Sequence, residues 1–73
     1  MDKPLLASFM ARYSDTQETL ADAMGLSLSR FNAKVNERDG AAFNQNEMRF
    51  IIDRYSLSQD DAMSIFFTKK VSQ

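Results

Sequence analysis

Cysteine and histidine are both absent from this chain of 73 residues. Without cysteine, neither a disulfide framework nor a thiolate metal site can form. Without either residue, the usual zinc sites and the commonest acid–base catalyst are also missing. No pair of the remaining carboxylates has an evident nucleophile beside it. We therefore expect a protein that is not an enzyme and that uses no metal and no cofactor.

Long apolar runs are missing too. None approaches the roughly 20 residues that span a bilayer, and residues 1–4 are not followed by the pattern of a secretory signal peptide. These absences predict a cytoplasmic protein with no membrane partner. Nor is there an excess of positive charge, because the formal net charge is −1. Taken alone this balance disfavours nucleic-acid binding, so the placement of the charges along the chain becomes decisive.

The residues that are present have the composition of an ordinary globular domain, 44% hydrophobic and 26% charged, which argues against disorder. The apolar residues recur every three or four positions, as on one face of a helix, and no segment alternates as a strand does. A chain of this length makes one domain. We expect an all-α domain over residues 1–73, with helices at about 4–13, 17–24, 28–36, 45–55 and 59–67.

Capping residues predict where these helices begin and end. Pro4 suits a first helical turn, where its missing N–H costs nothing. Asn44 followed by Glu47 has the layout of a capping box. Gly25 can end the second helix because glycine readily adopts a left-handed conformation. The hydroxyl residues able to cap the second, third and fifth helices are Thr16, Ser27 and Ser58.

Residues 17–36 predict two short helices joined by a tight turn at residues 25–27. The side chains expected to hold the pair together from inside are Leu20, Met24, Leu26, Phe31 and Val35. Those left outside on the second helix of the pair are short, polar and basic. Such a surface suits a helix that enters the major groove of DNA and reaches base edges.

Five residues of this segment stand at spacings found together in one family: Gln17, Leu20, Ala21, Gly25 and Phe31. With them the segment resembles the helix-turn-helix of the lambda-repressor-like family, the phage Cro and repressor type also called XRE. The run Phe31-Asn32-Ala33-Lys34, and a later helix that opens with Phe43 and Glu47, resemble small phage-associated regulators of this family. The similarity covers residues 4–67 and implies a compact five-helix lambda-repressor-like DNA-binding domain.

The resemblance also implies which residues meet double-stranded DNA. The base-reading positions of the third helix correspond here to Ser27, Leu28, Ser29, Asn32 and Ala33. Gln17 corresponds to the phosphate contact that opens the second helix, and Asn36 lies near the end of the third. Two residues depart from the family pattern: Leu28 replaces a long polar reader and can make only apolar contacts, such as one to a thymine methyl, and Lys34 replaces a usually apolar residue.

Basic residues recur every four positions at Arg30, Lys34 and Arg38, and form one ridge if the third helix extends that far. Residues 27–38 carry these three cations and one acid, Glu37, for a local charge of +2. We interpret the ridge as a surface for phosphate contacts, the alternative being a solvated helix face. Five of the acids outside residues 27–38 are expected to be helix-start charges and solubilising surface: Asp15, Glu18, Asp22, Asp60 and Asp61.

One such domain reads few base pairs, so useful specificity implies a homodimer on a two-fold site. Apolar residues beyond what a small bundle can bury mark a candidate dimer surface at Phe50, Met63, Phe67 and Val71. We expect a sequence-specific transcriptional regulator, a Cro-like phage or prophage repressor that binds no small-molecule ligand. The alternative is a protein-interaction module, an antirepressor or adaptor, that keeps the helical scaffold and binds a partner protein through its Phe/Met surface.

Overall fold

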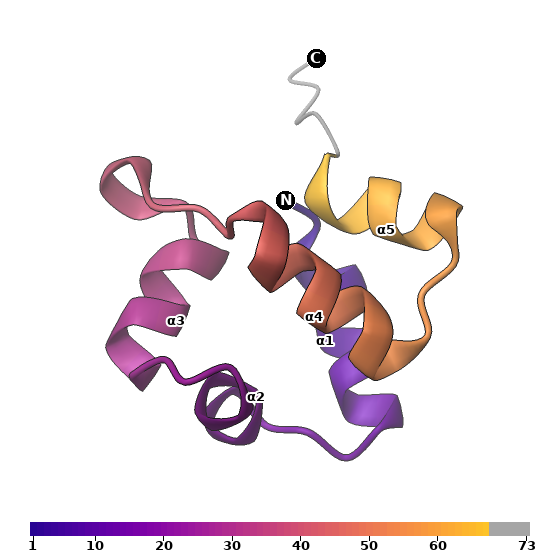
Figure 1. Ribbon diagram of the computed structural model, residues 1–73, viewed down its shortest axis with the longest axis horizontal. Helices are drawn as coiled ribbons and strands as arrows, with labels where there is room; N and C mark the ends of the chain where they lie inside the picture. Colours follow the sequence, from indigo (N-terminus) through magenta and orange to yellow (C-terminus); the bar gives the residue numbers. More distant parts are fainter. Residues whose placement is uncertain (68–73) are drawn as a thin grey trace.

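The computed structural model of the chain describes residues 1–67 (Figure 1). These residues form five α-helices and no strand: α1 (Lys3–Arg12), α2 (Gln17–Ala23), α3 (Leu28–Val35), α4 (Gln45–Tyr55) and α5 (Gln59–Phe66). The all-α, five-helix prediction is confirmed, and every helix begins and ends within one residue of its expected range. Within the expected loop between α3 and α4 lies a short 3-10 turn, η1 (Arg38–Gly40).

The predicted caps close the N-terminal ends of four helices. A side-chain oxygen of each cap accepts a hydrogen bond from a backbone N–H three residues on; these caps are Thr16, Ser27, Asn44 and Ser58. Asn44 and Glu47 form the expected reciprocal capping box, and a second box joins Thr16 and Thr19. Each cap satisfies a backbone donor that has no partner within its helix.

The turn between α2 and α3 has the geometry expected at a glycine stop. Gly25 adopts a φ of +73°, which glycine accepts without steric cost. The N–H of Leu26 donates to the carbonyl of Ala21 at 2.9 Å, and that of Gly25 to Asp22 at 3.0 Å. This Schellman arrangement satisfies the last carbonyls of α2. Because Ser27 caps α3 immediately afterwards, the two helices are held in a tight corner.

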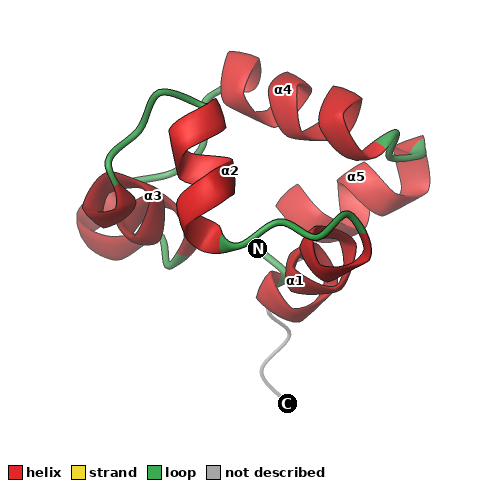
Figure 2. Cartoon of the chain, turned by 90° about the horizontal axis from the view of Figure 1, so that it is seen from below, coloured by secondary structure: helices red, strands yellow, loops and turns green. Residues whose placement is uncertain are grey.

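All five helices contribute to one core. Leu20, Phe31, Ile51 and Ile65 are fully shielded from solvent and come from α2, α3, α4 and α5, while Leu6 of α1 is 2% exposed. Figures 1 and 2 together show α1 and α4 on opposite faces of the molecule, and α3 and α5 at opposite edges. None of the helices within residues 1–67 is both long and apolar enough to cross a bilayer.

Candidate nucleic-acid interface

Helices α2 and α3 pack against each other through their inner faces. Leu20 and Ala21 on α2, and Phe31 and Val35 on α3, are all buried. Both views show α3 at the edge of the molecule, with no other helix on its outer side (Figures 1 and 2). The packing that buries one face of α3 therefore leaves the opposite face directed outward.

The first turn of α3 is open to solvent. Ser27, Leu28, Ser29 and Arg30 are all exposed, and the Leu28 side chain is 43% exposed although it is apolar. The Arg30 guanidinium makes no hydrogen bond and no ion pair with any part of the chain that the structure describes. This turn combines small polar side chains, one exposed apolar side chain and a positive charge that no described residue compensates.

Farther along α3, the candidate residues are less accessible. Asn32, Ala33 and Lys34 are partly buried, whereas Asn36 is exposed. The Asn36 amide nitrogen donates to the backbone carbonyl of Asn32 at 2.9 Å, and its oxygen accepts from the ammonium of Lys3 at 2.9 Å. The amide of Asn36 is thus held in place by groups of the protein itself.

Lys34 is directed toward α4. Its ammonium lies 2.9 Å from a carboxylate oxygen of Glu47 and 3.4 Å from the carbonyl of Ala42, and the two charged side chains are only 14% and 17% exposed. The same oxygen of Glu47 accepts the backbone N–H of Asn44 at 2.9 Å. Lys34 therefore anchors α3 to the start of α4, and its charge is already neutralised.

The predicted basic ridge does not form one helical face. Helix α3 ends at Val35, and Glu37 then adopts a left-handed φ of +51°, so that Arg38 lies in η1 beyond the helix. A single helical face needs consecutive residues in right-handed geometry, which the chain leaves here. Arg30 and Arg38 are exposed on separate elements, while Lys34 is held by Glu47.

The start of α2, where Gln17 is exposed, is fixed by a polar network that the sequence did not reveal. The Asp15 carboxylate accepts hydrogen bonds from Nε and Nη2 of Arg54 at 2.8 and 2.9 Å. It also accepts from the hydroxyls of Tyr55 at 2.7 Å and Thr19 at 3.0 Å. The expectation that Asp15 is a solubilising surface charge is wrong, because its side chain is only 8% exposed.

This network shifts the ionisation of its members. The Arg54 guanidinium, bonded to Asp15, holds the pKa of that carboxyl well below its usual range, because an opposite charge at hydrogen-bond distance favours the charged form. Burial raises the pKa of the Tyr55 phenol, and the neighbouring Asp15 carboxylate raises it further. The network ties the beginning of α2 to the end of α4 and so fixes the position of Gln17.

No family model, curated protein or solved structure matches this chain. The membership of the lambda-repressor-like family therefore stays a prediction that depends on the residues quoted above. The case for a function comes from the chemistry of the outer surface of α3.

The candidate dimer residues fall into two places. Met63 and Phe67 are 52% and 59% exposed; Phe67 caps the C-terminal end of α5, and its N–H donates to the carbonyl of Met63 at 3.0 Å. Phe50 is 37% exposed and lines a hollow between α2 and α4 together with Met24. Val71 lies outside the described residues. The candidate dimer residues within residues 1–67 thus form one pair at the C-terminal part of α5 and a separate spot on α4.

Proposed function

We propose that the chain is a sequence-specific DNA-binding regulator of transcription, a repressor of the Cro-like phage or prophage type, in which α3 enters the major groove. The observation that carries this proposal is the open first turn of α3. Arg30 offers a guanidinium there that has no partner within residues 1–67, beside exposed Ser27 and Ser29. A short helix with small polar side chains can approach the base edges closely.

The chemistry of six candidate residues allows each a role at the DNA. Ser29 and Asn32 would hydrogen-bond base edges, and Leu28 would contact a thymine methyl. Gln17 and Arg30 come from two different helices and would hold phosphates, which sets the orientation of α3 on the duplex. Lys34 could reach a phosphate only by releasing Glu47, which makes it a weaker candidate than Arg30.

Specificity and repression follow from two copies of this arrangement. One α3 covers few base pairs, so we propose a homodimer that places two such helices about one helical turn of DNA apart, roughly 34 Å. A bound dimer would repress a gene by blocking polymerase, and neither a cofactor nor a small-molecule ligand enters this mechanism. The proposed site of action is the cytoplasm.

A protein-interaction module is the second candidate function. It is favoured by two exposed apolar side chains, Met63 of α5 and Phe67 at the C-terminal end of that helix. Helix α5 itself lies at the opposite edge of the molecule from α3 (Figure 1). The formal net charge of −1 also favours it over a nucleic-acid partner. In this function the chain would be an antirepressor or adaptor whose affinity depends on apolar contact.

Selection of bound sequences from a pool of random duplexes tests the proposal. Recovery of a palindromic motif would support both the DNA-binding function and the dimer. Binding through phosphates must also weaken as salt rises, with a log–log slope of about −0.9 per contact. Binding through exposed apolar side chains would respond little to salt, and the absence of any enriched duplex would refute the regulator and favour the interaction module.

Arg30→Ala tests the face of α3 directly. We expect it to weaken binding to all duplexes and to make the salt slope less steep by about 0.9. Arg49→Ala is the matched control, because Arg49 is an exposed residue of α4 without an ion pair within residues 1–67. Asn32→Ala should instead relax the preference at one base position, by roughly 1–3 kcal/mol. Variants that bind as the parent does would show that another surface carries the function.

A further inference from the structure

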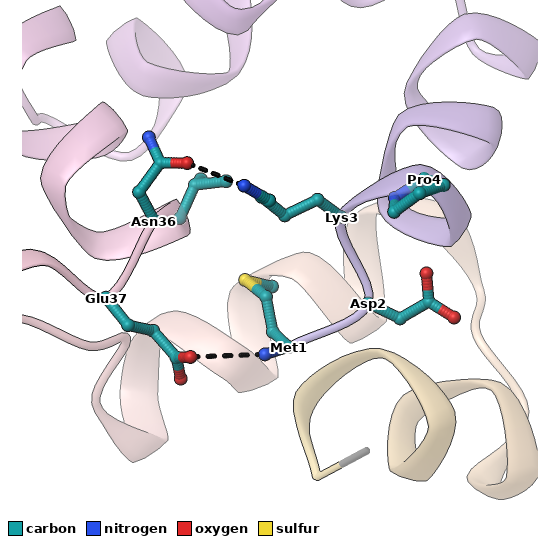
Figure 3. A pocket seen from close by; sticks show the side chains of 7 residues that line it. Met1, Asp2, Lys3, Pro4, Asn36 and Glu37 are labelled. Carbon is teal, nitrogen blue, oxygen red and sulfur yellow. Dashed lines mark hydrogen bonds and ion pairs between the residues drawn. The ribbon is translucent and has the colours of Figure 1, made fainter. Parts of the chain in front are cut away.

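Three helices meet around a hollow of about 260 Å³ beside the C-terminal end of α3. Its apolar lining residues are Leu6, Ala7, Met10, Phe31 and Val35. Its polar lining residues are Lys3 from α1, Gln17 from α2 and Asn36 from the end of α3. One water molecule occupies roughly 30 Å³ of liquid volume, so the hollow can admit a hydrated polar group. A larger neighbouring hollow shares Lys3 and Asn36 with it (Figure 3).

The charge of Lys3 is not neutralised by any described carboxylate. Its ammonium is bonded to the neutral amide oxygen of Asn36 at 2.9 Å (Figure 3). Of the two nearby acids, Glu37 is paired with the ammonium of Met1 at 3.2 Å, whereas Asp2 accepts the backbone N–H of Leu5 at 3.1 Å and keeps its charge. Lys3 is thus an exposed cation held at the end of α3 by a hydrogen bond that leaves its charge in place.

The hollow beside Leu28, at the start of α3, has the reverse character. There Leu28 lines a hollow together with the exposed acids Glu18 and Asp22 of α2, and no salt bridge within residues 1–67 neutralises either acid. An approaching anion is therefore repelled more strongly at the hollow of Glu18 and Asp22 than at the hollow of Lys3, where a cation stands beside Asp2. This asymmetry favours the hollow of Lys3 for contact with an anion.

We infer that Lys3, Gln17 and Asn36 form one site for a phosphate of the DNA backbone, an inference that rests on the proposed function. Lys3 supplies the positive charge. The side-chain amide of Gln17 makes no hydrogen bond within residues 1–67 and supplies a free donor, and Asn36 has a second N–H besides the one bonded to Asn32. Because the three residues come from three helices, a phosphate bound there fixes the register of α3 in the groove.

Lys3→Gln tests this site, with a pool of labelled random-sequence duplexes as the probe. We expect the variant to weaken binding to all sequences and to make the log–log salt slope less steep by about 0.9. Lys3→Arg keeps the charge and should keep the slope of the parent. Arg49→Gln is the matched control, since it removes the same charge from α4, and it should leave the slope unchanged. Urea unfolding should show equal stability for all variants, because Lys3 is exposed.

The possible failures are distinguishable. If the parent chain binds no duplex, the proposed function and the phosphate site are both overturned. If the parent binds and Arg30→Ala reduces the slope while Lys3→Gln behaves as Arg49→Gln does, the function stands and the phosphate site is overturned. A reduced slope for Lys3→Gln, restored in Lys3→Arg, supports the site.

Discussion

Replacing Asp15 by asparagine should destabilise the domain more than any other exchange of a carboxylate for an amide in residues 1–67. Each oxygen of Asp15 accepts two hydrogen bonds: one oxygen from Arg54 and Tyr55, the other from Arg54 and Thr19. An amide has one acceptor oxygen and one donor nitrogen. Whichever way it is turned, its NH₂ group faces an N–H of the Arg54 guanidinium, which cannot accept, so that hydrogen bond is lost together with the negative charge that strengthens the others.

The size of the loss follows from these contacts. A hydrogen bond to a charged group contributes about 1.5–3 kcal/mol. The Arg54 side chain is 33% exposed, so water compensates part of what it loses. Tyr55 is 1% exposed, and its hydroxyl has no such compensation. We expect the free energy of unfolding to fall by about 3 kcal/mol, which is most of the roughly 3–5 kcal/mol available to a domain of this size.

Urea unfolding followed by far-UV circular dichroism measures this loss. Asp53→Asn is the matched control, because Asp53 is exposed on α4 and its carboxylate makes no hydrogen bond or salt bridge within residues 1–67. The control should change the free energy of unfolding by no more than about 0.5 kcal/mol. Equal midpoints for Asp15→Asn, Asp53→Asn and the parent would show that the network contributes nothing and would refute the reasoning.

The pH dependence gives an independent check. The pKa of Asp15 is lowered in the folded chain by its hydrogen bonds to Arg54, whereas an aspartate in the unfolded chain has a pKa of about 3.9 and so titrates around that pH. The folded state therefore binds fewer protons, and the contribution of Asp15 is fully present above that pH and is lost as the pH falls below it. We expect the difference in stability between the parent and Asp15→Asn to shrink below about pH 4. A constant difference down to about pH 2 would contradict the assigned cause.

Two further predictions concern the elements that hold α3. Lys34→Met should lower the free energy of unfolding by about 1–2 kcal/mol, because it leaves the partly buried Glu47 carboxylate without its cation. The control Arg30→Ala should change the free energy of unfolding by less than about 0.5 kcal/mol. Equal effects of the two exchanges in urea unfolding would mean that Lys34 is a solvated cation. Gly25→Ala should lower the free energy of unfolding by about 1 kcal/mol because an alanine is strained at this positive φ. The added Cβ itself meets no atom within 4 Å. A thermal midpoint equal to that of the parent would exclude this strain.

The helices were predictable from the sequence because their signals are local. A capping box such as Asn44 with Glu47 joins residues three positions apart, and the stop at Gly25 depends on the conformation of a single residue. Apolar spacing then shows which face of each helix is buried, as it did for Phe31 and Val35. The outward placement of the first turn of α3 follows from that same periodicity.

The partners of the charged residues were decided only by the tertiary structure. Asp15 meets Arg54 across 39 residues, Lys34 meets Glu47 across 13, and Lys3 meets Asn36 across 33. The spacing of four residues between Arg30 and Lys34 shows that both side chains can lie on one side of a helix. The packing of α4 beside α3 determined that, within residues 1–67, Lys34 is neutralised and Arg30 is not. Local sequence determines how the backbone of each helix begins and ends, whereas a charge is compensated or left free by whatever the folded chain brings within a few ångströms of it.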